Sequence, residues 1–123
     1  MVIATTSSTA VLAGEWLSPG VHINAVGAPR PDWRELDDEV LRRTRVYVDS
    51  REAAMKESGD VIAAGKIFAE VGEVVAGTKP GRQSSEEVTL FKSLGLAVED
   101  VATAELIYRK ALDEEASSTY SGS

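Results

Sequence analysis

Small polar and glycine residues follow the short apolar segments of this sequence, where they could bind a ligand. Thr5 ends the first apolar run, Asn24 and Gly27 lie in and after the second, and Ser93 follows the last. A hydroxyl at the end of a strand can donate to a ribose or phosphate, and a glycine lets a flat ring approach the backbone closely. The alternative interpretation is structural, with Thr5 a β-forming residue and the other positions a strand end and its turn.

A single histidine, His22, limits the acid–base and metal chemistry that the chain could perform. A Ser-His-Asp triad could use only His22, and no Gly-x-Ser-x-Gly turn accompanies it. A zinc site with two histidine ligands is excluded within one chain. We interpret His22 as structural, because a lone histidine beside an apolar strand is more often hydrogen-bonded in place than catalytic. The acidic pairs at 37–38, 86–87 and 114–115 are far apart and indicate solvated helix ends, so we expect no metal site.

Composition and charge exclude several classes of protein. The 123 residues suit one domain or half of a larger one, and 43% hydrophobic with 27% charged residues is typical of globular chains. A net charge of −7 opposes nonspecific binding to nucleic acid and to anionic membranes. The absence of cysteine excludes disulfides, thiolate metal sites and a cysteine nucleophile. We recognise no secretory leader or membrane span and expect a cytoplasmic location.

The apolar pattern predicts strands that alternate with helices. Short β-branched runs predict strands at 2–6, 22–26, 45–49 and 89–93, the first of them buried. Caps and apolar periodicity predict four helices and a disordered tail. The helices are expected at 38–43 after Asp37 or Asp38, at 51–57 after Ser50, at 67–75 and at 98–114, and the tail at 117–123.

This alternation is typical of an α/β fold with a parallel sheet. A doubly wound nucleotide-binding sheet carries a Gly-x-Gly-x-x-Gly loop in its first strand-to-helix turn. No such loop follows any of the predicted strands. The chain is therefore interpreted as the second half of a Rossmann-like, doubly wound domain.

Three ordered blocks of sequence resemble the ornithine cyclodeaminase/mu-crystallin family. Order and spacing agree from about residue 3 to residue 110. A further run, PDWRELDD at 31–38, is similar to the mu-crystallin, or ketimine reductase, branch of that family. The blocks are GVHINAVG at 20–27 with RELD at 34–37, VDSREAA at 48–54 with ESGD at 57–60, and FKSLG at 91–95 with AVED at 97–100.

The resemblance covers only the C-terminal part of the family's chains, which are more than twice as long. It implies that residues 1–96 form the second half of an NAD(P)-binding Rossmann-like domain. Residues 97–116 would form the helix that returns to a second domain, which binds substrate and supports a homodimer. The Gly-rich loop, and the Lys and Arg that the family uses on the substrate carboxylate, belong to the part upstream of the resemblance.

The family's activity is reduction of a C=N bond with hydride from a nicotinamide cofactor, or, in the cyclodeaminases, use of bound NAD. The resemblance therefore implies the C-terminal part of a ketimine reductase for cyclic imines derived from amino acids. NADPH is the expected cofactor and NADH the alternative. The competing hypotheses are an inactive binding protein for NADPH and a thyroid-hormone-like ligand, a partner subunit, or a truncated product without function.

The resemblance also implies site residues, although it assigns no catalytic residue. Cyclodeaminases carry an Asp and mu-crystallin a Ser at the position of Pro29, whose side chain can neither donate nor accept, so ornithine cyclodeamination is disfavoured. The Glu57 carboxylate could stabilise a cationic imine, and its alternative is a solvated acid at a helix end. The implied cofactor contacts are Thr5, Asn24, Val26, Gly27, Ser93 and Leu94, and the implied substrate contacts are Pro29, Glu57 and Ser93.

Overall fold

A five-stranded sheet with only parallel neighbours forms the centre of the protein, in the order β1-β2-β5-β3-β4. The structure is a computed structural model that describes the backbone of residues 1–120 and the side chains of residues 1–114. The parallel α/β fold predicted from the sequence is confirmed. The strands are β1 (Val2–Ile3), β2 (His22–Ala25), β3 (Arg45–Val48), β4 (Ala69–Glu70) and β5 (Thr89–Lys92).

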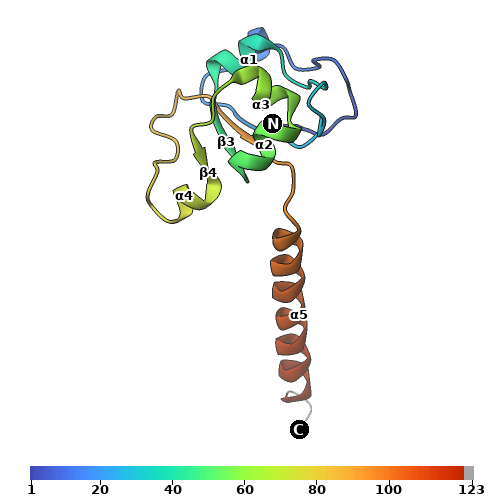
Figure 1. Cartoon of the computed structure of the whole chain (residues 1–123). Coiled ribbons are helices and arrows are strands. Elements are labelled where there is room, and N and C mark those ends of the chain that lie inside the picture. The colour runs from blue at the N-terminus through green and yellow to red at the C-terminus, as the bar shows by residue number, and fades with distance from the viewer. Residues whose placement is uncertain (121–123) are drawn as a thin grey trace.

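Three short helices pack on one face of this sheet (Figure 1), and their N-terminal caps are encoded locally. They are α1 (Asp38–Arg43), α2 (Arg51–Glu57) and α3 (Gly59–Ala64). The side chains of Asp37, Ser50 and Ser58 accept hydrogen bonds from the third residue after each of them. The prediction for α1 and α2 is confirmed, whereas α3 was missed, because Ser58 ends α2 and caps the next helix at once.

The core lies between the helices and the inward-facing side chains of the sheet. Ile23, Ala25 and Leu90 are completely buried, as expected for alternate positions of adjacent strands. They pack with Val40 and Val61 of the helices. On the opposite face a hollow of about 550 Å³ opens between the sheet and the α4 region, so that face is covered less completely.

Residues 67–75, predicted as one helix, form strand β4 and the short helix α4 (Val71–Val75). That prediction was wrong because pairing with β3 overrides the helical periodicity. The N–H of Phe68 donates to the carbonyl of Val46, and β4 continues beside β3. Glu70 then starts α4 through a capping box with Glu73, which also fixes where strand ends and helix begins.

The first strand is shorter and more exposed than predicted. β1 covers only Val2–Ile3, and the side chain of Val2 is 67% exposed. The prediction of a buried strand over 2–6 was wrong for this chain, because β1 lies at the edge of the sheet with β2 as its one neighbour. Only the Ile3 side of the strand reaches the core.

Helix α5 (Ala97–Tyr120) extends away from the sheet and its helices (Figure 1). The side chains of residues 97–114 are all exposed. The helix continues through 117–120, the first part of the segment predicted to be disordered, because Ser and Thr lower helix propensity without ending a helix. Residues 121–123 lie outside the described part. No helix within residues 1–120 is long and apolar enough to cross a membrane.

Replacing Asp37 by Ala should lower the free energy of unfolding by about 1–2 kcal/mol, because a helix cap is lost. The Asp37 carboxylate accepts from the N–H of Val40 at 2.7 Å and from the N–H of Gly14 at 3.0 Å. Asp38→Ala is the matched control, since Asp38 is exposed and pairs only with Arg34 at the surface; its effect should stay within about 0.5 kcal/mol. Urea unfolding of both variants checks this, and equal losses would contradict it.

The anchorage of α4 should weaken in acid. The backbone N–H of Glu70 and the Arg51 guanidinium hold the pKa of the Glu73 carboxyl below its ordinary value. The resulting stabilisation is therefore complete above that ordinary pKa and is lost as the pH falls through the lowered one. Unfolding curves recorded over decreasing pH should show a loss of stability that is smaller in Glu73→Gln. The same decline in Glu73→Gln would contradict the assignment.

Candidate functional site

The carboxyl ends of β1, β2, β5 and β3 meet at one edge of the sheet, because all neighbouring strands are parallel. Ile3 is in register with Ala25, and Lys92 is in register with both Ala25 and Val48. Thr5, Gly27 and Ser93 therefore follow three neighbouring strands at the same edge. In open α/β sheets this edge is where ligands bind. The structure thus brings together residues that lie far apart in the sequence.

Glu35 joins the loops that follow β1 and β2. Its Oε1 accepts from the N–H of Thr5 at 2.6 Å and from the Thr5 hydroxyl at 2.7 Å. Its Oε2 accepts from the N–H of Gly27 at 2.9 Å. In this arrangement the Thr5 hydroxyl donates its hydrogen bond to Glu35 and accepts one from the Ser7 N–H. Thr5 can therefore meet a ligand as an acceptor and not as the donor that we expected.

Gly27 has no room for a side chain. A Cβ atom there would overlap the Glu35 carboxylate and the carbonyl oxygen of Thr5. The glycine is thus required by packing against Glu35 as well as by any approach of a ligand. Val26, just before it, keeps its side chain 49% exposed at the edge, which leaves an apolar surface beside the polar loop ends.

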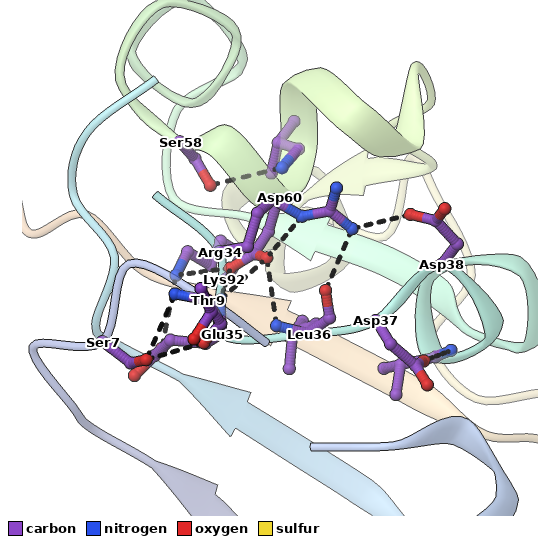
Figure 2. A network of polar contacts seen from close by, with 12 residues as sticks. Ser7, Thr9, Arg34, Glu35, Leu36, Asp37, Asp38, Ser58, Asp60 and Lys92 are labelled. Carbon is purple, nitrogen blue, oxygen red and sulfur yellow. Dashed lines mark hydrogen bonds and ion pairs between the residues drawn. The ribbon is translucent and has the colours of Figure 1, made fainter. Parts of the chain in front are cut away.

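A cluster of buried charges lies beneath this edge (Figure 2). The side chains of Lys92, Glu35 and Asp60 are completely buried, with Lys92 Nζ 3.7 Å from Glu35 Oε2 and 3.4 Å from Asp60 Oδ2. Lys92 also donates to the carbonyl oxygen of Gly27. The Asp60 carboxylate accepts from the N–H of Glu35 and from the N–H of Leu36, each at 3.1 Å, and so fixes the backbone of both residues.

Asp49 performs a similar task for the loops after β3 and β5. Its Oδ2 accepts from the N–H of Leu94 at 2.7 Å, from the N–H of Gly95 at 2.8 Å and from the Ser93 hydroxyl at 3.2 Å. Its Oδ1 accepts from the N–H of Ser50 at 2.9 Å. The carboxylate therefore fixes the Ser93 hydroxyl and the backbone of Leu94 and Gly95. The resemblance implied Ser93 and Leu94 as ligand contacts.

The sequence analysis missed Glu35, Lys92, Asp60 and Asp49. One signal was present: Lys92 follows Leu90 at an inward position of an apolar strand, where a charge needs a buried partner. An aspartate directly after a strand, as at Asp49, was a second signal. The identity of the partners depends on contacts over 24 to 65 residues of sequence, which no local pattern contains.

The other candidate residues, Asn24, Pro29 and Glu57, make no hydrogen bond to Glu35 or Asp49. Asn24 points to the open face of the sheet, where its Oδ1 is 3.2 Å from His22 Nε2. His22 Nδ1 lies 2.8 Å from the Thr89 hydroxyl, so both ring nitrogens have a partner, which supports the structural interpretation of His22. Pro29 and Glu57 are exposed, the first in the loop after β2 and the second at the end of α2. Among the described side chains, those of residues 1–114, no acidic or histidine cluster could hold a metal ion.

Known proteins with similar sequences belong to the family that the three sequence blocks resemble. The model of the ornithine cyclodeaminase/mu-crystallin family matches residues 1–115. The ketimine reductase mu-crystallin of Macropus fuliginosus is 60% identical over 109 residues, which are 88% of this chain and 34% of that protein. The chain therefore spans about a third of the length of this curated relative.

Two solved structures share the fold. The Δ1-pyrroline-2-carboxylate reductase of Thermococcus litoralis, in complex with NADH and L-proline, superposes with a TM-score of 0.83 at 47% identity. It is matched over 93% of this chain and 38% of its own. An archaeal alanine dehydrogenase, a dimer with bound NAD, superposes with a TM-score of 0.80 at 41% identity, over 93% of this chain and 38% of its own.

Replacing Gly27 by Ala should lower the free energy of unfolding by about 1–3 kcal/mol, because the added methyl group overpacks against Glu35 and Thr5. Gly72→Ala is the matched control. No atom lies within 4 Å of a Cβ at Gly72, and it occupies a helix, so alanine should stabilise by about 0.5–1 kcal/mol. Chemical denaturation measures both, and two changes of the same sign would contradict the packing argument.

Proposed function

Because the chain belongs to the ornithine cyclodeaminase/mu-crystallin family, we propose that it forms the nicotinamide end of the site of an NAD(P)H-dependent reductase. The substrate class is cyclic imines derived from amino acids, with the C=N bond as the reacting group. The observation that carries the proposal is the convergence of Thr5, Gly27 and Ser93 at one sheet edge, held by Glu35 and Asp49. The relative solved with NADH and L-proline supports the substrate class, since proline is the amine that reduction of Δ1-pyrroline-2-carboxylate gives.

The residues at this edge fit one end of a nicotinamide cofactor. A nicotinamide ring has an apolar face and a carboxamide, and the edge offers the exposed side chain of Val26 next to the polar groups around Thr5 and Ser93. The sequence contains no Gly-x-Gly-x-x-Gly turn, so these residues cover the ring and not the pyrophosphate. Val26, Gly27, Ser93 and Leu94 are the proposed cofactor contacts, with Thr5 as a hydrogen-bond acceptor.

The chain contributes position and electrostatics to the proposed reaction. The bound cofactor supplies hydride for the imine carbon, while a proton remains on the nitrogen of the product amine. Val26 and Gly27 would bound the ring, and the Glu57 carboxylate would stabilise the positive charge of the protonated imine. Pro29 contributes no side-chain hydrogen bond to the ligand, which directs the proposal away from ornithine cyclodeamination.

The proposal also states which of the two reduced cofactors, NADPH or NADH, the protein uses. We propose NADPH with NADH as the alternative, and two related structures contain NADH or NAD. In such sheets the ribose 2′ position is read about 20 residues after the Gly-rich turn, and this sequence has no such turn. Both cofactors are therefore to be tested side by side.

We further propose that α5 leads from the nucleotide-binding part, residues 1–96, to a second domain that supports a cytoplasmic homodimer. The helix exposes large apolar side chains, among them Val98, Val101, Ile107 and Tyr108. Such a surface is typical of a helix that packs against another unit. One structural relative is a dimer, which supports the assembly.

A second candidate function is binding without catalysis. The chain would then act as an inactive partner subunit or bind NADPH with a thyroid-hormone-like ligand. Pro29 is the observation that favours it, since a residue able to exchange a proton is replaced by one that cannot. Cofactor binding without turnover would distinguish this candidate from the reductase.

The decisive experiment uses the native polypeptide that contains this sequence. Purified protein is mixed with NADPH or NADH and with Δ1-pyrroline-2-carboxylate or its six-membered homologue. We expect imine-dependent oxidation of the cofactor and no conversion of ornithine with NAD. Binding of cofactor without oxidation would favour the second candidate, and absence of both binding and oxidation would overturn the two proposals.

A matched pair of variants tests the role of Glu57. Glu57→Gln removes the negative charge proposed to face the imine and should lower kcat/KM for the imine about tenfold, equivalent to about 1.4 kcal/mol. Glu52→Gln is the control, because Glu52 lies on the same helix and pairs with Lys56 at the surface. Steady-state rates measure both, and equal values for the two variants would contradict the assignment.

A further inference from the structure

The buried charges beneath the sheet edge need an explanation beyond stability. Lys92, Glu35 and Asp60 are completely buried, and Arg34 Nε reaches Asp60 at 3.3 Å, so two cations face two anions. Burial of each ion costs several kcal/mol even after the protein relaxes, and apolar side chains of similar volume often give equal or higher stability. The cluster therefore contributes no more stability than apolar side chains would at the same positions. Its role lies in the groups that it holds in place.

The cluster holds one residue, Gly27, through the two peptide groups on either side of its Cα atom. The N–H of Gly27 donates to Glu35 Oε2 at 2.9 Å, and the carbonyl oxygen of Gly27 accepts from Lys92. The other oxygen of Glu35 holds the backbone and hydroxyl of Thr5. Two loops from separate strands are thus fixed through one carboxylate. Lys92 lies beside that carboxylate (Figure 2) and also donates to the Gly27 carbonyl.

We propose that Glu35 and Lys92 are positioning residues for the nicotinamide ring. They fix Gly27 and Thr5 at the part of the edge that would contact the ring. They do not contact the ring themselves. This inference rests on the proposed function. A misplacement of about 1 Å in a reactive site can cost a hundredfold in rate, which is reason enough to bury charges for geometry.

Three variants separate positioning from stability. Glu35→Gln keeps the size of the side chain but aims an amide N–H₂ either at the Gly27 N–H and Lys92 or at the Thr5 N–H, since only one of its two ends can accept. Lys92→Met leaves two buried carboxylates facing Arg34 alone. The double variant again leaves one cation, Arg34, and one anion, Asp60, and should be more stable than either single variant. It still lacks the Lys92 hydrogen bond to the Gly27 carbonyl, and a glutamine at position 35 can accept from the Gly27 N–H or from the Thr5 N–H but not from both.

Two further variants serve as controls. Val40→Ala destabilises the core from a fully buried position on α1, among residues that do not hold the Gly27 loop. Glu39→Gln removes a carboxylate from an exposed pair with Arg42. The first measures what loss of stability alone does to cofactor binding, and the second what loss of a negative charge does.

The experiment measures NADH and NADPH dissociation constants, the KM for cofactor, kcat and thermal unfolding on the native polypeptide. We expect Glu35→Gln and the double variant to bind cofactor about tenfold more weakly, as for a buried hydrogen bond left unmade. Both controls should bind like the wild type. Recovery of affinity together with stability in the double variant would overturn the inference, as would a loss of affinity in Val40→Ala equal to that in Glu35→Gln.

A second measurement tests the positioning role if the wild type binds neither cofactor. That outcome overturns the proposed function. Hydrogen exchange at the Gly27 amide or at the Thr5 amide, whichever loses its acceptor, should then accelerate in Glu35→Gln and in the double variant. It should stay slow in Val40→Ala relative to that variant's other amides. Equal acceleration across the whole sheet in every variant would show a structural role only and would overturn the inference as well.

Discussion

The ion cluster formed by Lys92, Glu35 and Asp60 is the constraint on which the carboxyl edge of the sheet depends. An ammonium group without solvent must have partners, and here the partners are two carboxylates and the Gly27 carbonyl. Each carboxylate in turn binds backbone N–H groups of the loops around it. The position of one buried lysine on β5 thereby fixes the course of the chain near Gly27 and Glu35.

The order of the strands brings these side chains close to the loops that they bind. Strand β5 is last in the sequence yet lies between β2 and β3, so its end borders the ends of both. Lys92, at the end of β5, reaches the β2 loop, and the loop that begins at Ser93 is held by Asp49 after β3. Two carboxylates, Glu35 and Asp49, thus connect four strand ends into one surface.

That surface is the half of a cofactor site that we propose for this chain. The ring end of a nicotinamide cofactor needs an apolar contact and fixed polar groups, which Val26 and the two carboxylate-bound loops offer. A pyrophosphate needs a glycine-rich turn at a helix N-terminus, which this sequence does not contain. Pro29 disfavours ornithine cyclodeamination, because a proline side chain exchanges no proton.

The sequence by itself determined what depends on neighbouring residues. The caps at Asp37 and Ser50 began helices where expected, and apolar alternation found β2, β3 and β5 and hence the parallel α/β fold. Only the tertiary structure decided that 69–70 is a strand and that Glu35, Lys92, Asp60 and Asp49 hold the edge together. The reason is physical: caps and periodicity act within a few residues, whereas a strand partner or a buried counter-ion is chosen by packing between segments that are distant in the chain.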